Sequence, residues 1–154
     1  MFPIGLAILC LNTPICTLLS CDPDLEQAIR MLPGQTGRFC RKYCLFIFAV
    51  NSIVASIYLC SWQMVSGGLD FVHVWTLLIF ALQSAILSVI LEWKHPIRGW
   101  KTESDLWHHP RKYIVPLAML LIAAFVGTYP PVLGILSAVL LMECGILLYT
   151  TRRE

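Results

Sequence analysis

The residue whose type and position could most readily carry out chemistry is Glu143, which lies between Met142 and Cys144 in a long apolar stretch of the sequence. A carboxyl group at the centre of a membrane helix costs roughly 2.5 to 3.5 kcal/mol, so it should be protonated or face a polar partner. Asn51 and Gln83, each inside another apolar stretch, are the candidate partners. The pattern allows a proton or ion relay. We favour a hydrogen bond between helices, within the chain or to a partner subunit, because one isolated acid makes a poor relay.

A second acid, Glu92, ends another apolar stretch directly before Trp93 and Lys94. At that position we expect a wet membrane interface, where an acid is tolerated. An ion pair with Lys94 or Arg98 then explains Glu92 better than a catalytic role. We expect Glu92 to end the helix and to help fix the orientation of that helix in the membrane.

The four histidines are poorly placed to bind haem. Only His73 lies inside an apolar stretch, close to the outer boundary of the predicted span, whereas His95, His108 and His109 fall in one polar segment. A membrane haem site needs axial histidines deep on facing helices. We therefore expect no cofactor of the chain's own, and any haem should belong to a partner.

The seven cysteines form no CxxC pair and stand at no metal-ligand spacing with a histidine, so neither a metal site nor a disulfide framework is predicted. Cys40 and Cys44, beside the start of an apolar stretch, are candidate palmitoylation sites, and free structural thiols explain them equally well. The sequence has no GxSxG, HExxH, P-loop or GxGxxG pattern and no pair of carboxylates placed for acid–base work. We do not expect an enzyme.

Helices in a lipid bilayer must position these residues. Of the 154 residues, 58% are hydrophobic and only 13% are charged, and the mean hydropathy is +0.75, which is too apolar for a soluble domain of this size. The loops are too short to hold a separate catalytic domain. The predicted fold is all-α: an integral membrane four-helix bundle with an extra hydrophobic N-terminal segment.

The predicted organisation has three parts: residues 1–20 form the hydrophobic N-terminal segment, residues 21–42 a cytosolic polar segment, and residues 43–154 the four-span membrane domain. The spans are expected at residues 43–62, 71–93, 113–128 and 132–150. The N-terminal segment has no basic start and is interrupted by Pro3 and Pro14. It could be a kinked span, an in-plane or half-inserted helix, or a weak signal peptide.

The basic residues all fall on one predicted side. They precede the first span, join the second span to the third, or follow the fourth, and they comprise Arg30, Arg38, Arg41, Lys42, Lys94, Arg98, Lys101, Arg111, Lys112, Arg152 and Arg153. Short loops rich in Lys and Arg stay in the cytosol, so both ends of the four-span domain and the 94–112 connection are predicted there. The endoplasmic reticulum, the Golgi and the plasma membrane all satisfy this orientation.

Small residues recur at four-residue spacing within the spans, as in Ser52 with Ser56, Ala81 with Ala85, Ser84 with Ser88, Ala123 with Gly127, and Gly134 with Ala138. Such pairs let helices approach closely. They serve packing inside the bundle and a partner-binding face equally well.

Two groups of motifs in the C-terminal two-thirds of the chain carry a family resemblance. The first closes the second span and opens the basic connection: Leu91-Glu92-Trp93, Pro96, Arg98, Gly99 and Lys101. The second opens and follows the last two spans: Arg111-Lys112-Tyr113, Leu133-Gly134, Gly145 and Arg153-Glu154. Together they resemble the cytochrome b light chain family, the small membrane subunit of phagocyte-type NADPH oxidases.

The resemblance implies a non-catalytic subunit that binds and stabilises a haem-bearing NADPH oxidase and supports its superoxide production. Animal members carry a proline-rich cytosolic tail that docks an SH3 domain, but no PxxP follows residues 132–150 here and the 94–112 loop is shorter. SH3 docking is therefore not expected, whereas the membrane role fits a shortened fungal-type relative. The expected partners are a larger membrane oxidase subunit and the lipid bilayer, and not nucleic acid.

Two other functions remain open. The stretch from Leu91 to Pro96 is also similar to small Golgi tetraspan proteins associated with COPI vesicles, which implies a role in trafficking without an oxidase. The third alternative is a small transporter or channel in which Glu143 lines the pathway.

Overall fold

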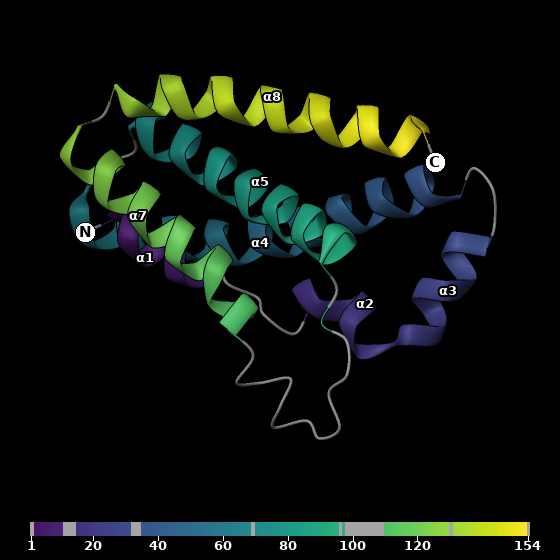
Figure 1. The fold of residues 1–154 in the computed structure, drawn as a ribbon. Coiled ribbons are helices and arrows are strands. Elements are labelled where there is room, and N and C mark those ends of the chain that lie inside the picture. The colour runs from purple at the N-terminus through teal and green to yellow at the C-terminus, as the bar shows by residue number, and fades with distance from the viewer. Residues whose placement is uncertain are drawn as a thin grey trace.

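The computed structural model describes residues 2–10, 15–31, 35–68, 70–95, 97, 110–129 and 131–153. In these ranges all regular secondary structure is helical, which confirms the predicted all-α class. Figure 1 shows long helices lying beside one another, with the short helices of residues 2–31 packed against them.

In the described residues up to 31, the chain forms four short elements: α1 (Phe2–Leu9), the 3-10 turn η1 (Ile15–Thr17), α2 (Leu18–Cys21) and α3 (Pro23–Met31). The start of α3 has a local cause. The Asp22 side chain accepts a 3.1 Å hydrogen bond from the backbone N–H of Leu25, and Pro23 occupies the first helical position. These residues end α2 and begin a new helix in a different direction.

The longer helices follow: α4 (Thr36–Ser66), α5 (Phe71–Lys94), a 3-10 turn η2 (Pro110–Tyr113), α7 (Ile114–Thr128) and α8 (Val132–Arg153). The turn after α4 depends on Gly67, whose φ of 77° is left-handed and whose N–H donates to the carbonyl of Gln63 at 2.9 Å. This cap ends α4, and the chain then returns along it as α5.

The helix starts follow the predicted span starts closely, with one exception. α4 begins at Thr36, inside the segment predicted to be polar, rather than near Tyr43. Arg38, Arg41 and Lys42 are exposed on this extension. Because Arg and Lys are good helix formers, the helix continues beyond the end of its apolar stretch.

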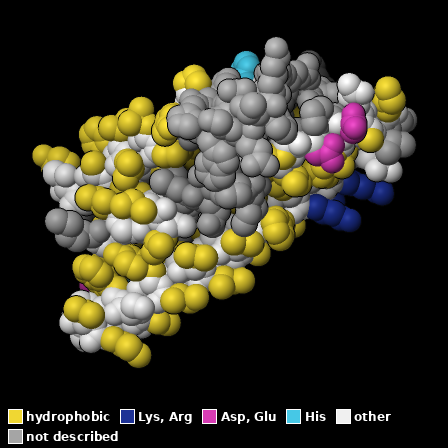
Figure 2. Space-filling model, turned by 90° about the horizontal axis from the view of Figure 1, so that it is seen from below, with side chains coloured by type: hydrophobic (Ala, Val, Ile, Leu, Met, Phe, Trp, Pro, Cys, Tyr) yellow, Lys and Arg dark blue, Asp and Glu magenta, His cyan; other side chains and the backbone are white. Residues whose placement is uncertain are grey.

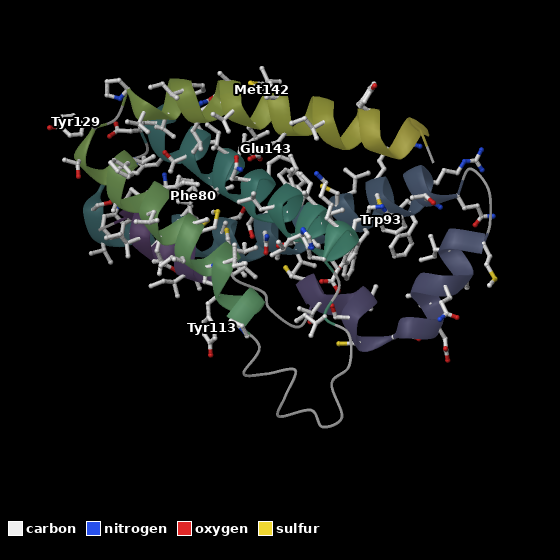
Figure 3. All side chains as sticks on the ribbon, viewed as in Figure 1. Phe80, Trp93, Tyr113, Tyr129, Met142 and Glu143 are labelled. Atoms are coloured by element: carbon white, nitrogen blue, oxygen red, sulfur yellow. The ribbon has the colours of Figure 1, made fainter. Side chains whose placement is uncertain are left out.

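The central helix of the fold is α5, which contacts α1, α4, α7 and α8. In its most apolar stretch 61% of the residues are buried, against 17% in the corresponding stretch of α4. Phe80, labelled in Figure 3, is fully buried at the middle of α5, in one cluster with Leu6 of α1 and Met119 of α7. The core therefore forms around α5, and the other long helices cover it.

Two of the described helices, α4 and α5, are long and apolar enough to cross a membrane by length and composition. The apolar helices α7 and residues 132–146 of α8 are shorter. With 15 residues, α7 is about 22 Å long at a rise of ~1.5 Å per residue.

Candidate functional site

A polar stripe runs along one face of α5. It consists of Ser84, Ser88 and Glu92, which recur every four residues and so point from the same side of the helix. Their side chains are 1%, 3% and 0% exposed. Polar groups removed from water are costly unless hydrogen bonds replace the water. The segment that covers this stripe therefore matters for the stability of the fold.

The N-terminal segment supplies that cover. The Ser84 hydroxyl donates a 2.7 Å hydrogen bond to the backbone carbonyl of Cys10. Farther along, the Cys16 thiol lies beside the Ser88 hydroxyl. At the end of the stripe, the backbone N–H of Ser20 donates to the Glu92 carboxyl group at 2.6 Å. Polar positions of the N-terminal segment thus meet polar positions of α5 in chain order.

Two more hydrogen bonds surround the last of these contacts. The Ser20 hydroxyl accepts the backbone N–H of Ile97 at 2.9 Å, and the Tyr43 hydroxyl accepts the backbone N–H of Leu18 at 3.3 Å. We call Leu18, Ser20, Tyr43, Glu92 and Ile97 the N-terminal clasp. The clasp ties α2 to the first part of α4 and to the end of α5 at once.

The prediction that Glu92 sits in a wet interface is wrong. Its side chain is fully buried, because α2 covers the end of α5, and the Ser20 amide is a partner of its carboxyl group. Lys94, one of the two expected ion-pair partners, is exposed, and Arg98 lies outside the described residues. Glu92 therefore works as an internal acceptor that anchors a distant part of the chain.

Of the two predicted partners, Gln83 is the one that contacts the carboxyl group of Glu143. The Gln83 amide nitrogen donates to Glu143 at 2.6 Å, and Figure 3 shows Glu143 pointing from α8 toward α5 while Met142 points away. Gln83 is 2% exposed and Glu143 is half-buried. Asn51, the other candidate, is fully buried on α4. The pair joins α5 to α8 by a polar contact.

The amide oxygen of Gln83 has no hydrogen-bond partner among the described residues. A neutral carboxyl group can donate a proton to such an oxygen and accept from the amide nitrogen at the same time. The Gln83 side chain therefore offers a free acceptor beside the donor that it uses toward Glu143.

The small residues fall into two classes. On α5, Ala81 and Ala85 are buried with the serines of the polar stripe, so they serve packing inside the bundle. On α8, Gly134 and Ala138 are exposed, and a Cβ added to Gly134 or to Gly145 would meet no atom within 4 Å. Close approach on that side of α8 is thus available to a second molecule.

Comparison of the chain with known protein families, with characterised proteins and with solved structures finds no match.

The histidine at the start of α5 takes part in an aromatic contact. The His73 ring lies 4.6 Å from that of Phe2 in a T-shaped arrangement, and its Nδ1 is 3.9 Å from an Asp70 carboxyl oxygen. His108 and His109 lie outside the described residues. In the described part of the chain, no three His, Cys, Asp or Glu side chains converge as a metal ion would require.

All seven cysteines are free thiols, and the two candidate palmitoylation sites differ in access. Cys40 is 2% exposed, in a cluster with Tyr43 and Ile47, which favours the structural interpretation there. Cys44 is partly buried. Acylation of Cys40 would require α4 to move away from its neighbours.

The clasp was not foreseen from the sequence. Three of its partners, at Leu18, Ser20 and Ile97, are backbone amides, which every residue type other than proline provides and which therefore carry no signal. The available signal was the four-residue spacing of Ser84, Ser88 and Glu92, which marks a polar face on an apolar helix. Such a face demands a polar partner along its whole length.

Proposed function

We propose that the chain is an integral membrane protein, with a bundle of four spans at residues 43–62, 71–93, 113–128 and 132–150. The observation that carries this proposal is the apolar outer surface, and Figure 2 shows hydrophobic side chains over much of one face. Large hydrophobic side chains are exposed on three helices: Leu45, Phe46, Ile53 and Ile57 on α4, Leu117, Leu121 and Phe125 on α7, and Ile135, Leu141 and Met142 on α8. Soluble monomers rarely expose contiguous apolar patches beyond a few hundred Å². A bilayer is the solvent that such a surface fits.

Charge placement supports a single orientation. The exposed cations Arg38, Arg41 and Lys42 lie on the first turns of α4, and Figure 2 shows Lys and Arg side chains gathered at one end of the visible face. Lys94, also exposed, ends the antiparallel helix α5 at that same end. By the positive-inside rule this end belongs in the cytosol, and the turn at residues 66–70 belongs on the far side.

Aromatic residues support the same placement. Tyr113 and Tyr129 stand at the two ends of α7, both exposed, and are labelled in Figure 3. Tyr and Trp concentrate where the hydrocarbon meets the headgroups. The length of α7 between these tyrosines is shorter than a ~30 Å hydrocarbon core, which is compatible with a locally thinned bilayer or with polar groups reaching toward water.

Within that membrane we propose a non-catalytic accessory role: the chain binds and stabilises a haem-bearing NADPH oxidase and supports its superoxide production. The motifs that resemble the cytochrome b light chain support the partner's identity, and the outward-facing Gly134, Ala138 and Gly145 support close contact with another helix.

Purification of the tagged full chain in mild detergent tests the proposal. The expected result is a copurifying membrane protein with haem absorbance, together with loss of cellular superoxide production when the chain is deleted. Recovery of COPI or Golgi components without haem, and unchanged superoxide production, would replace the oxidase proposal with the trafficking alternative.

A further inference from the structure

The N-terminal segment follows α5 from one end to the other. The Phe2 ring packs on His73, near the first turn of α5, and the carbonyl of Cys10 meets Ser84 near its middle. Ser20 meets Glu92 in the last turn. From His73 to Glu92 the axis of α5 rises by roughly 28 Å, at ~1.5 Å per residue, which is close to the thickness of the hydrocarbon core.

Successive residues of the N-terminal segment contact successive positions along α5, and an in-plane helix could not do this. A helix lying in the interface keeps all its residues at one depth, so its two ends cannot meet the two ends of a spanning helix. It also needs a polar face, but α1 has the sequence FPIGLAIL, without one polar side chain. Both observations favour a crossing segment over an interfacial one.

We propose that residues 2–20 cross the membrane beside α5 and remain part of the folded protein, so that Phe2 and Thr36 lie on opposite sides of the bilayer. This inference rests on the proposed membrane embedding of α5. The bundle then has one more crossing than the four spans named above, and the described parts of the additional one are α1, η1 and the start of α2.

The packing of α1 fits this position. Leu6, Ala7 and Cys10 are 0% exposed and face the bundle, while Ile4 and Ile8 are 39% and 56% exposed on the other side. Its main contacts are with α7 and α4. One side of α1 thus packs on protein, and the other offers only hydrocarbon to its surroundings.

The placement of the basic residues indicates which way residues 2–20 cross the membrane, and the buried polar stripe indicates that they are not cleaved off. No Lys or Arg occurs in residues 1–20, whereas the first cations, Arg30 and Arg38, follow the Ser20 end, which the positive-inside rule keeps in the cytosol. Removal of the segment would also uncover the buried polar stripe of Ser84, Ser88 and Glu92. If the segment were cleaved off after insertion, the polar stripe of α5 would lose the groups that cover it.

Glycosylation mapping of the full chain tests this inference. An N-glycosylation acceptor on a flexible spacer is placed ahead of residue 2 in one variant and within the turn at residues 66–70 in another, and both are expressed in microsomes. We expect both acceptors to be modified. The intact mass of the untagged protein should include residues 2–20.

The outcomes separate the two proposals. Modification at 66–70 but not ahead of residue 2 would overturn the crossing and leave the four-span bundle standing. An intact mass that lacks residues 2–20 would overturn retention in the same way. Absence of modification at 66–70 would contradict the membrane bundle itself, and the crossing with it.

Discussion

The backbone N–H of Ser20 donates a 2.6 Å hydrogen bond to the carboxyl group of Glu92, which lies 72 residues farther along the chain. The carboxyl group is fully buried, so protein groups must replace the water that it would otherwise bind. Ser20 in turn accepts the Ile97 amide through its hydroxyl, which extends the contact beyond the end of α5. This pair of residues fixes one end of the N-terminal segment to the bundle.

Replacing Glu92 with alanine should destabilise the protein. The Ser20 amide would lose its acceptor inside the bundle, and a buried donor left without a partner costs about 1 to 3 kcal/mol. Glu92→Gln is the matched control, since it keeps an acceptor oxygen at the same place and should cost less. Thermal unfolding in detergent, followed by circular dichroism, provides the comparison. Equal stability of the alanine variant and the parent would contradict a stabilising role for the clasp.

Gly5→Ala should weaken the docking of α1. A Cβ at Gly5 would meet the Tyr58 ring, which stacks on Phe2 at 5.5 Å and so has little freedom to move away. Forcing a methyl group into such a contact typically costs about 1 to 3 kcal/mol. Gly145→Ala, where the added Cβ meets nothing within 4 Å, should leave unfolding nearly unchanged. Similar behaviour of the two variants would show that α1 is not packed against α4.

A double-mutant cycle on Gln83 and Glu143 should reveal coupling between α5 and α8. Each single change to leucine leaves one polar group without its partner, whereas the double change removes both. Hydrogen bonds between membrane helices average about 0.6 kcal/mol and reach about 1.7, so we expect a coupling energy of about 1 kcal/mol. Additive effects would contradict the pairing.

Glu143 also distinguishes bracing from transport. Glu143→Gln retains an acceptor for the Gln83 amide, so the bundle should stay folded. If the chain is an accessory subunit, ion or proton flux in proteoliposomes should be the same for this variant and the parent. Flux in the parent that the substitution abolishes would favour the small-transporter alternative.

Gly134→Leu should impair partner binding without harming the chain's own fold. Gly134 is exposed on α8 and has open space around it, so a larger side chain disturbs only what approaches from outside. Gly127→Leu is the matched control, because Gly127 is equally open but lies on α7. We expect at least about tenfold weaker recovery of the partner with Gly134→Leu, which corresponds to about 1.4 kcal/mol. Equal loss with both variants would mean that the α8 face is not specific.

Thiol labelling in native membranes should follow exposure and surroundings. Cys21 is exposed near the proposed cytosolic end and should react with a water-soluble maleimide that reaches that side. Cys10 and Cys40, at 0% and 2% exposure, should stay unmodified until the protein is unfolded. Cys60, exposed on α4, should react only with a membrane-permeant reagent if lipid covers that helix. Rapid labelling of Cys60 by the water-soluble reagent would contradict the lipid-facing surface.

The positions of the long helices could be predicted because apolar stretches in a sequence mark them directly. α5 and α8 begin at Phe71 and Val132, where the predicted spans begin. Hydropathy, however, marks the edge of an apolar stretch and not the end of a helix. It therefore missed the first turns of α4, where Thr36 to Lys42 remain helical although they are largely polar.

The candidate site was only partly predictable. Glu143 stands out as an acid in an apolar helix, and the cost of leaving it alone predicts a polar partner. The sequence offers Asn51 and Gln83 equally, and the structure selects Gln83. The burial of Glu92 does not follow from its neighbours in sequence, since it depends on α2 folding back over the end of α5. That tertiary contact is made by the backbone amide of Ser20, which the sequence pattern cannot distinguish from any other.

Protease accessibility in sealed microsomes tests the proposed membrane bundle and its orientation directly. A specific cleavage site is inserted between residues 98 and 109, in the basic connection after α5. If the bundle spans the membrane as proposed, the site is cleaved while the membrane is intact, and both fragments stay in the membrane after an alkaline wash. Protection of the site until detergent is added, or release of either fragment by the wash, would contradict it.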